Sequence, residues 1–195
     1  MNTKSVCYVG VIQKQLNKVP IFLKEELSST TNSDIVYQRS SAYNLLYNLV
    51  ADNFILDFDI DRIKKHSTKK PYILDSNLNI SLTHTKELCA SIVSSNVVGV
   101  DIEEIERFDT FTQKEKLPFY KAGMTVEELC KEWAILESIF KTQNKSVFNV
   151  NKVEKAGYSL IIRKLEYKGK RYILAVSSIG EIDLQIKLDS EIIVK

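Results

Sequence analysis

Two carboxylates stand at the end of an apolar run in the middle of the chain. Residues 97–103 have the composition of a strand, and Asp101 and Glu103 lie two positions apart in it. Side chains at positions i and i+2 of a strand project from the same face, about 7 Å apart. Such a pair can share a hard divalent cation, and Mg²⁺ prefers one or two carboxylates together with phosphate oxygens. The alternative, favoured for the pair alone, is a solvated strand end whose acidic surface continues through Glu104 and Glu106.

A second candidate is an acidic residue on the apolar side of a predicted helix over residues 125–142. Thr125 and Glu128 form a capping-box pattern that marks the helix start. At about 100° per residue, Glu137 falls inside the apolar arc, which is formed by Val126, Leu129, Trp133, Leu136 and Phe140. An acidic side chain in such a place must be paired, protonated or bound to a metal. Lys141, one turn on, is the obvious partner, but a surface pair of this kind leaves the apolar neighbours unexplained, which favours a functional role for Glu137.

The third candidate is a basic stretch followed by a strand that ends in histidine. Arginine and lysine recur between residues 62 and 70, and residues 79–84 end in Thr83 and His84. Ammonium and imidazole groups near a strand end could bind phosphates. The alternative, favoured when each piece is taken alone, is a solvated loop beside a hydrogen-bonded histidine. Because no second histidine or cysteine stands at metal-ligand spacing from His84, zinc is not expected.

In their order and spacing these pieces resemble the 4′-phosphopantetheinyl transferases, in particular the double-sized, Sfp-type members. The resemblance covers residues 70–141, and its matching segments are Lys70-Pro71, Thr83-His84, Gly99-Val100-Asp101-Ile102-Glu103 and the run from Trp133 to Lys141. They are similar to the family's Gly-Lys-Pro, Ser-His, Gly-(Ile/Val)-Asp-(Ile/Val)-Glu and Trp-x-x-Lys-Glu-(Ala/Ser)-x-x-Lys patterns. Further upstream, Arg39 resembles the arginine on the family's first-half helix.

The resemblance implies Mg²⁺-dependent transfer of phosphopantetheine from coenzyme A to a serine of an apo acyl or peptidyl carrier protein, with release of 3′,5′-ADP. It implies that Asp101, Glu103 and Glu137 hold the metal, and that Asp101, Glu137 and Lys141 are catalytic. In that scheme Glu137, directly or through a water, is the candidate base, and Lys141 stabilises the departing phosphate. The nucleotide end of coenzyme A would be held by the residues Arg39, Lys69, Lys70, Thr83 and His84.

Two departures from the family's pattern affect the expected grip on coenzyme A. Leu136 replaces the lysine that usually precedes the motif glutamate, and Lys69 replaces the usual glycine. Either the chain binds coenzyme A weakly for want of that cation, or Leu136 has become a core residue and the phosphates are held elsewhere, by Lys69 and Lys70. The alternative function is a catalytically weak module that binds coenzyme A or a carrier protein. A nucleic-acid binder would rest on the basic stretch alone, which lacks interleaved aromatic residues, and is not expected.

Composition sets the class of protein that must hold these residues. The 195 residues are 44% hydrophobic and 27% charged, which is typical of a globular chain rather than a disordered one. With a net charge of +2, the chain offers no overall case for a nucleic-acid or membrane partner. The three cysteines are far apart in the sequence, which predicts no disulfide framework. The start of the sequence does not resemble a signal peptide and there is no long apolar run, so that a cytoplasmic protein is expected.

The elements that must position the candidates are predicted from periodicity. Strands are expected over residues 5–12, 79–84, 88–93, 97–103, 158–166, 172–177 and 182–188, and helices over 34–54 and 125–142. The strands at 88–93 and 97–103 are expected to form a hairpin. The order predicts an α+β fold of two similar halves, each a helix with antiparallel strands, and the resemblance implies their packing as an intramolecular pseudo-dimer that is active as a monomer. Residues 1–95 would carry the coenzyme-gripping helix, basic loop and histidine strand, and residues 96–195 the metal site.

Overall fold

The computed structural model describes residues 4–14, 19–66, 70–110, 115, 117, 119–143 and 155–195. Its helices are α1 (Ile21–Ser28), α2 (Ser33–Asn53) and α3 (Val126–Gln143), with the short 3₁₀ helices η1 (Ile60–Arg62) and η2 (Ile105–Thr110). The strands are β1 (Lys4–Val11), β2 (Ile63–Lys65), β3 (Pro71–Ile73), β4 (Asn79–His84), β5 (Leu88–Ser94), β6 (Val98–Glu104), β7 (Tyr158–Tyr167), β8 (Lys170–Ile179), β9 (Asp183–Leu188) and β10 (Ile193–Val194). The predicted α+β class is confirmed, and each predicted helix or strand lies close to an observed one.

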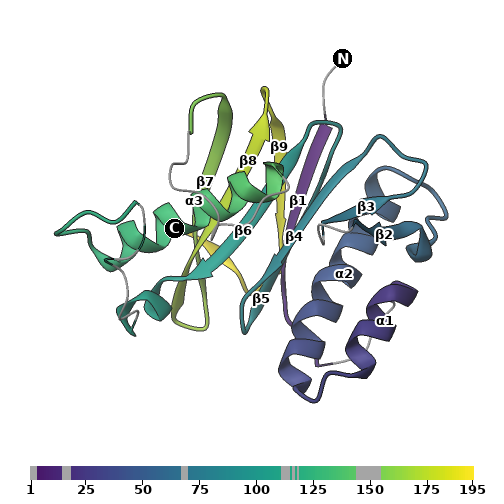
Figure 1. Ribbon diagram of the computed structural model, residues 1–195, viewed down its shortest axis with the longest axis horizontal. Coiled ribbons are helices and arrows are strands. Elements are labelled where there is room, and N and C mark those ends of the chain that lie inside the picture. Colours follow the sequence, from purple (N-terminus) through teal and green to yellow (C-terminus); the bar gives the residue numbers. More distant parts are fainter. Residues whose placement is uncertain are drawn as a thin grey trace.

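Two four-stranded sheets carry the fold (Figure 1). The first has the order β4-β5-β1-β9 and the second the order β10-β7-β8-β6. Neighbouring strands are antiparallel except β1 and β9, which run parallel. The first sheet is thus completed by β9, a strand from beyond residue 95. The two predicted halves therefore share a sheet, and their arrangement as a pseudo-dimer stays a prediction.

The predicted hairpin over residues 88–103 is wrong, although both of its strands exist. β5 is paired with β4 on one side and with β1 on the other. Because both edges of β5 are already hydrogen bonded, β6 has no edge of β5 to pair with and lies beside β8 in the second sheet. The connection between β5 and β6 is held locally, since the Asn96 amide N–H donates to Ser94 Oγ over 3.0 Å.

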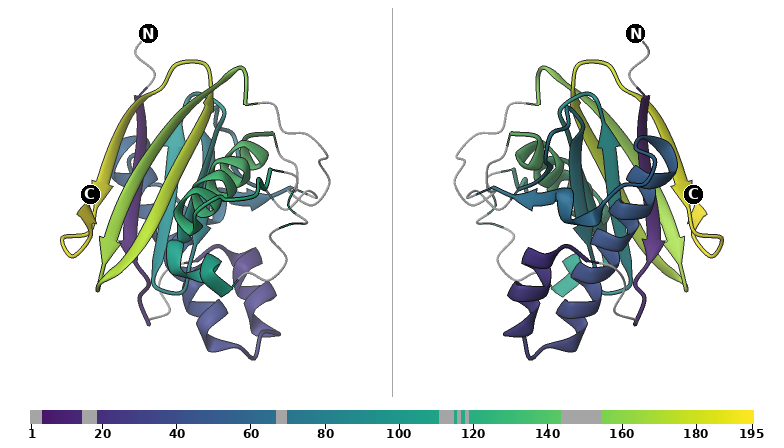
Figure 2. Two further views of the ribbon diagram at one scale, coloured as in Figure 1. Left: turned by 90° about the vertical axis from the view of Figure 1, so that its left-hand side faces the viewer. Right: turned by 90° about the vertical axis from the view of Figure 1, so that its right-hand side faces the viewer.

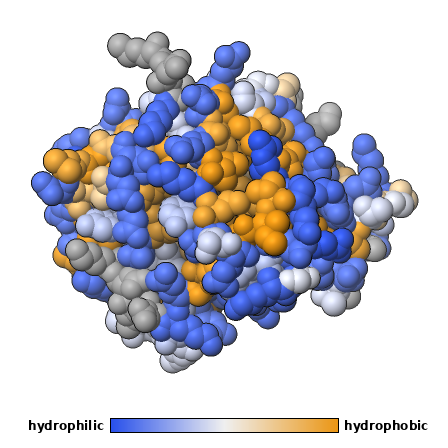
Figure 3. Space-filling model, turned by 180° about the vertical axis from the view of Figure 1, so that it is seen from behind, coloured by the Kyte–Doolittle hydropathy of each residue, from blue (hydrophilic) through white to orange (hydrophobic). Residues whose placement is uncertain are grey.

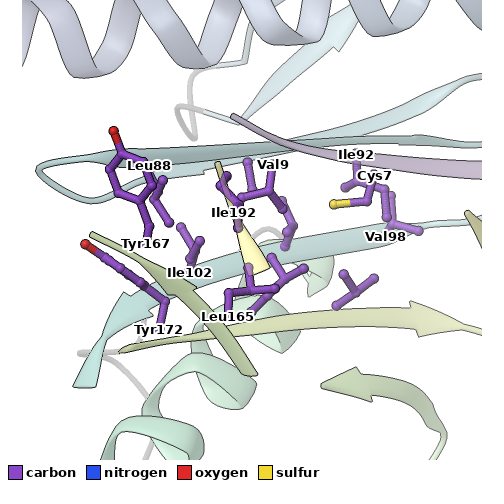
Figure 4. Close-up of a cluster of buried hydrophobic side chains, with 14 residues drawn as sticks. Cys7, Val9, Leu88, Ile92, Val98, Ile102, Leu165, Tyr167, Tyr172 and Ile192 are labelled. Carbon is purple, nitrogen blue, oxygen red and sulfur yellow. The ribbon is translucent and has the colours of Figure 1, made fainter. Parts of the chain in front are cut away.

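Buried apolar side chains fill the space between the two sheets (Figure 4). They come from β1 and β5 of the first sheet and from β6, β7 and β8 of the second, and include Val9, Ile92, Val98, Ile102 and Leu165. The opposite faces of the sheets are covered by helices, α2 against the first sheet and α3 against the second. Burial of this apolar surface is the main favourable contribution to folding. The layers therefore follow the order α2, first sheet, second sheet, α3.

Apolar surface remains on the side of the molecule away from the helices. The side views show β9 and the C-terminal end at the margin, opposite α3 (Figure 2). Leu184, Ile186 and Leu188 of β9 are only partly buried against the core between the sheets. The face seen from behind carries an apolar area bordered by polar side chains (Figure 3).

Among the described residues, no helix is both long and apolar enough to cross a membrane.

The starts of both long helices follow from local side chains. Asn32 Oδ1 accepts the Asp34 amide N–H over 3.0 Å, which caps α2. At α3 the predicted capping box is confirmed, because the Glu128 amide donates to Thr125 Oγ1 over 3.2 Å and Glu128 Oε2 accepts the Thr125 amide over 2.8 Å. Both helices therefore begin where the sequence indicates.

β6 and α3 approach each other so closely that only glycine fits at position 99. A Cβ atom built on Gly99 would lie 1.9 Å from the Ser138 carbonyl oxygen and 2.7 Å from Thr142 Oγ1. The first of these atoms is helix backbone, so that α3 would have to move to admit a side chain. On β8, Ser177 Oγ lies 2.6 Å from Thr142 Oγ1 and holds the same turn of the helix. This contact sets the distance between β6 and the part of α3 that carries Lys141.

We expect Gly99→Ala to lower the free energy of unfolding by about 3 kcal/mol, because the added methyl group forces α3 away from β6. Urea unfolding followed by circular dichroism measures the change. Gly123→Ala is the matched control: a Cβ there meets nothing within 4 Å, and only its positive φ of 89° opposes the substitution, at a cost of about 1 kcal/mol. Equal losses in the two variants would contradict the close-approach argument.

Candidate active site

Three elements meet at Asp101, which is 4% exposed. Its Oδ1 accepts hydrogen bonds from Lys141 Nζ of α3 over 2.7 Å and from Thr83 Oγ1 of β4 over 2.9 Å. Lys141 Nζ also donates to the Val100 carbonyl oxygen over 3.1 Å. The structure thus brings three of the predicted site residues together. The sequence suggests that Lys141 pairs with Glu137, one turn earlier on the same helix. In the structure Lys141 pairs with Asp101 instead, because α3 lies directly on β6 at this point.

The second carboxylate oxygen of Asp101, Oδ2, is buried and has no hydrogen-bond partner among the described residues. A buried polar atom left without a partner costs about 1–3 kcal/mol, and more when it belongs to a charged group. Such atoms are rare in folded proteins and often mark a place that an ion or a water completes. Oδ2 is therefore the atom of this site that most requires a ligand.

Glu103, two residues further along β6, is 9% exposed and is held by two donors. Trp133 Nε1 of α3 donates to Oε1 over 3.1 Å, and Arg107 Nη1 of η2 donates to Oε2 over 3.1 Å. The pKa of Glu103 is raised to about 7. Burial is the largest cause and repulsion from Asp101 the next, while attraction to Arg107 lowers the pKa. At neutral pH the fold therefore holds this carboxylate at an electrostatic cost.

Glu137 lies half-buried on α3, one turn after Trp133. Burial raises the pKa of Glu137, repulsion from Asp101 raises it further, and attraction to Lys141 opposes both. This burial matches the place in the apolar arc that the sequence predicts. The charge of Asp101 thus raises the cost of ionising Glu103 and Glu137, and a divalent cation would relieve that repulsion.

The ligands available at this point suit Mg²⁺. Carboxylate oxygens are hard ligands, and Asp101 Oδ2 is one that lacks a partner. Within the described residues no three histidine, cysteine, aspartate or glutamate side chains form a group that could hold a metal ion by themselves. Mg²⁺ does not require such a cage, since it binds through one or two carboxylates and completes its shell with water and substrate phosphates. The residues present therefore fit Mg²⁺ bound together with a phosphate-bearing substrate.

His84, at the end of β4, is a neutral group rather than a cation. Burial lowers the pKa of His84 to about 4, and the positive charges of Lys141 and Arg39 contribute to the decrease. At neutral pH the imidazole carries a single N–H, and a hydrogen bond with the Thr85 backbone opposes the fall in the pKa. The imidazole can therefore border a phosphate site without adding charge. Its neighbour Thr83 projects from the opposite face of the strand.

Lys70 reaches the C-terminal turn of α3. Its Nζ donates to the Lys141 carbonyl oxygen over 2.7 Å, and burial lowers the pKa of Lys70. A cation at this place satisfies a carbonyl of the last helical turn and interacts favourably with the helix dipole. Lys70 therefore supports the turn that carries Lys141, while Lys69, the other lysine predicted to hold the coenzyme, lies outside the described residues.

Arg39, on α2, lies in a cluster of ion pairs. Its guanidinium pairs with Glu26 of α1, and Lys65 of β2 pairs with the same carboxylate over 2.5 Å. Hydrogen bonds from Lys65 and then from Arg39 lower the pKa of Glu26. Arg39 is thus partly neutralised, yet it remains close enough to His84 to lower the pKa of that imidazole. No sequence spacing singles out Glu26, because its two partners lie 13 and 39 residues away.

A cavity of about 510 Å³ borders Glu103 and His84. Of the predicted residues, Glu103 and His84 line it, and the remaining lining residues are Gln38, Thr85, Lys86, Glu104, Glu106, Arg107, Thr110 and Lys170. A second cavity of about 290 Å³ shares Gln38 and Lys86 with the first and is also lined by Lys14 and Lys168. The two cavities therefore adjoin, and ammonium groups line both.

Sequence reasoning missed the lysines of this cavity. Lys86 lies in the turn after β4, and Lys170 lies at the start of β8, far along the chain. Of the basic lining residues, only Arg107 had a sequence signal, since it stands four residues after Glu103. Lys170 is brought to the cavity by sheet pairing, which its local sequence does not indicate.

Leu136 is a packing residue. Its exposed fraction is 2%, so that the core position, one of the two alternatives left by the sequence, is the correct one. A lysine at this position would have to bury its charge in α3, at considerable cost. A phosphate ligand in the cavity would meet the ammonium groups of Lys86 and Lys170 instead.

Compared with protein-family models and with curated proteins, the chain has no match in either set. The function of the site is therefore argued from its residues and their geometry.

The buried state of His84 predicts a pH dependence of stability. Between about pH 6.5 and about pH 4 the unfolded chain protonates this histidine and the folded chain does not, so that stability falls as the pH falls. Relative to His84→Gln, we expect the wild type to lose up to about 3 kcal/mol of unfolding free energy over this window. Urea unfolding at pH 7 and pH 4.5 measures it.

The chain supplies a matched control in its other histidine, His66, which is exposed. His66→Gln should keep the pH dependence of the wild type, and only His84→Gln should flatten it. A wild-type profile retained in His84→Gln would show that this histidine is not held neutral by the fold.

Proposed function

We propose that the chain transfers 4′-phosphopantetheine from coenzyme A to a serine hydroxyl of an apo acyl or peptidyl carrier protein. The observation that carries the proposal is the cluster at Asp101: a buried carboxylate with one orphaned oxygen, two further carboxylates of raised pKa and a lysine, next to a cavity of about 510 Å³. The order of the motifs over residues 70–141 supports the same reaction. All of these residues come from one chain, so that the proposed site needs no second copy.

In this reaction the serine oxygen attacks the phosphorus that carries the pantetheine arm. A new oxygen–phosphorus bond forms, the bond to the bridging oxygen of the pyrophosphate breaks, and 3′,5′-ADP leaves with that electron pair. Asp101, Glu103 and Glu137 would hold Mg²⁺, which supplies positive charge against the phosphate oxygens. The scheme requires no covalent intermediate with the protein.

Glu137 is the carboxylate best placed to take the serine proton. In the described part of the chain, Glu103 has a donor on each of its oxygens, and Asp101 Oδ1 accepts two hydrogen bonds. Burial raises the pKa of Glu137 above its usual range, and a base is most effective when its pKa lies near the working pH. Glu137 would accept the proton directly or through a water.

Lys141 is suited to the leaving phosphate. An ammonium group has three donors, and within the part of the chain that the structure describes Lys141 uses two of them, on Asp101 and on the Val100 carbonyl oxygen. The remaining N–H can bind a phosphate oxygen whose charge grows as the bond breaks. At the nucleotide end, His84 would contribute a neutral imidazole, and Lys86 and Lys170 would contribute ammonium groups, of which that of Lys170 is paired with Glu87 and Glu104.

A catalytically weak binding module is the second candidate. The observation that favours it is the occupation of Asp101 Oδ1 by Lys141 and Thr83, which leaves a single oxygen of that residue for a metal. Such a module would bind coenzyme A or a carrier protein and would not transfer the arm.

Intact mass spectrometry of apo carrier proteins after incubation with the chain, coenzyme A and Mg²⁺ tests the proposal. We expect a gain of one phosphopantetheine on a serine, with 3′,5′-ADP in equal amount, and no gain when a chelator replaces Mg²⁺. Carriers from fatty-acid, polyketide and peptide synthesis should be compared, and acceptance will rank them. Calorimetric binding of coenzyme A without any mass gain would favour the binding module, and the absence of both would contradict the transferase.

Glu137→Gln should lower kcat by at least about 100-fold, because it removes the proton acceptor while keeping the size of the side chain. Glu132→Gln is the matched control on the same helix, where Glu132 pairs with Lys155. It should leave kcat within about twofold of the wild type. Initial rates of 3′,5′-ADP release measure both, and equal rates in the two variants would remove Glu137 from the mechanism.

A further inference from the structure

The Glu103 carboxylate is held by two donors of different kinds. Trp133 Nε1 and Arg107 Nη1 lie 3.1 Å from its Oε1 and Oε2 respectively. The Glu103 side chain itself is 11% exposed. Among the described residues, each oxygen therefore has one donor, and the carboxylate is presented in a defined orientation.

Trp133 is the more firmly placed of the two donors. Its ring is partly buried, with ring centroids 6.2 Å from Phe108 and 6.4 Å from Phe119. It also stands on α3 one turn before Glu137, so that the same helix supplies a hydrogen bond to one carboxylate and carries another.

Arg107 is the less firmly placed donor. Its side chain is 73% exposed, and it pairs with Glu103 from four residues further along the chain. Only the Arg107 end of this pair lies in water, because the Glu103 end is buried and needs a positive charge beside it. Arg107 can therefore leave Glu103 when a bound cation supplies the charge in its place, while the packed indole of Trp133 stays where it is.

We propose that Trp133 is a positioning residue, whose indole N–H holds Glu103 in the orientation in which it binds a divalent cation. In this arrangement Arg107 is a hydrogen-bond donor that the cation displaces from the same carboxylate. The inference rests on the proposed metal site. A carboxylate offers about four lone-pair positions, so that the indole uses one and leaves others for a cation. Partners that hydrogen bond to a metal ligand typically change metal affinity 10–100-fold when they are removed.

Binding of Mn²⁺, measured by the electron paramagnetic resonance of the free ion, tests the inference without any turnover. Trp133→Phe keeps an aromatic ring against Phe108 and removes only the N–H donor. We expect this variant to bind Mn²⁺ 10–100-fold more weakly than the wild type. Arg107→Gln is the matched control, since it removes the other donor to the same carboxylate, and should bind Mn²⁺ at least as tightly as the wild type.

A second measurement uses the fact that Trp133 is the only tryptophan in the sequence. Mg²⁺ should change the emission of Trp133 in the wild type and leave it unchanged in Glu103→Gln, which tests the inference even if Trp133→Phe fails to fold. Equal Mn²⁺ affinity in the wild type and a folded Trp133→Phe, or an Mg²⁺ response retained in Glu103→Gln, would overturn the inference alone. Failure of the wild type to bind either ion, with or without coenzyme A, would overturn both the inference and the metal part of the proposed function.

Discussion

The contact between β6 and α3 at Gly99 is the constraint on which the candidate site depends. With a Cβ position only 1.9 Å from a helix carbonyl oxygen, the strand and the helix lie as close as backbones allow. That closeness lets Lys141 reach Asp101 over 2.7 Å and also donate to the β6 backbone. If the two elements separated, a buried carboxylate would lose its cation, which is a costly change in a site of low dielectric. The backbone contact therefore comes first, and the charges depend on it.

Around that contact the fold gathers carboxylates against their own repulsion. Glu103 and Glu137 both have raised pKa values, for which burial is the largest cause and the charge of Asp101 the next. Perturbed groups that share a polar cluster beside a cavity are typical of sites that bind or react, since a purely structural core would replace them with apolar residues. Part of the cost is compensated by Trp133, which donates to Glu103, and by Lys141, which donates to Asp101 and attracts Glu137.

The cavity beside this cluster is a product of both sheets. Tyr172 of β8 donates to Glu87, in the turn between β4 and β5, over 2.8 Å, and Lys170 pairs with Glu87 over 2.9 Å and with Glu104 of β6 over 3.4 Å. These links join the end of the first sheet to the end of the second, next to the place where His84 and Glu103 line the cavity. The site is therefore a property of the whole fold, and β9, which crosses into the first sheet, is part of the same framework.

The sequence alone predicts the α+β class, the approximate bounds of the long helices and most strands, the capping box at Thr125 and the burial of Glu137. Each of these depends on neighbours within a turn or two of the chain. The pairing of β6 with β8 rather than β5 could not be predicted, since strand pairing depends on which edges other strands have already taken. Three further features also depend on the tertiary structure, because they join side chains that are far apart in the sequence. They are the pairing of Lys141 with Asp101, the placement of Lys170 at the cavity and the pairing of Arg39 with Glu26. Periodicity reports which face of an element is buried, but which residues meet across that face depends on how closely the backbones can approach, and here a single glycine sets that distance.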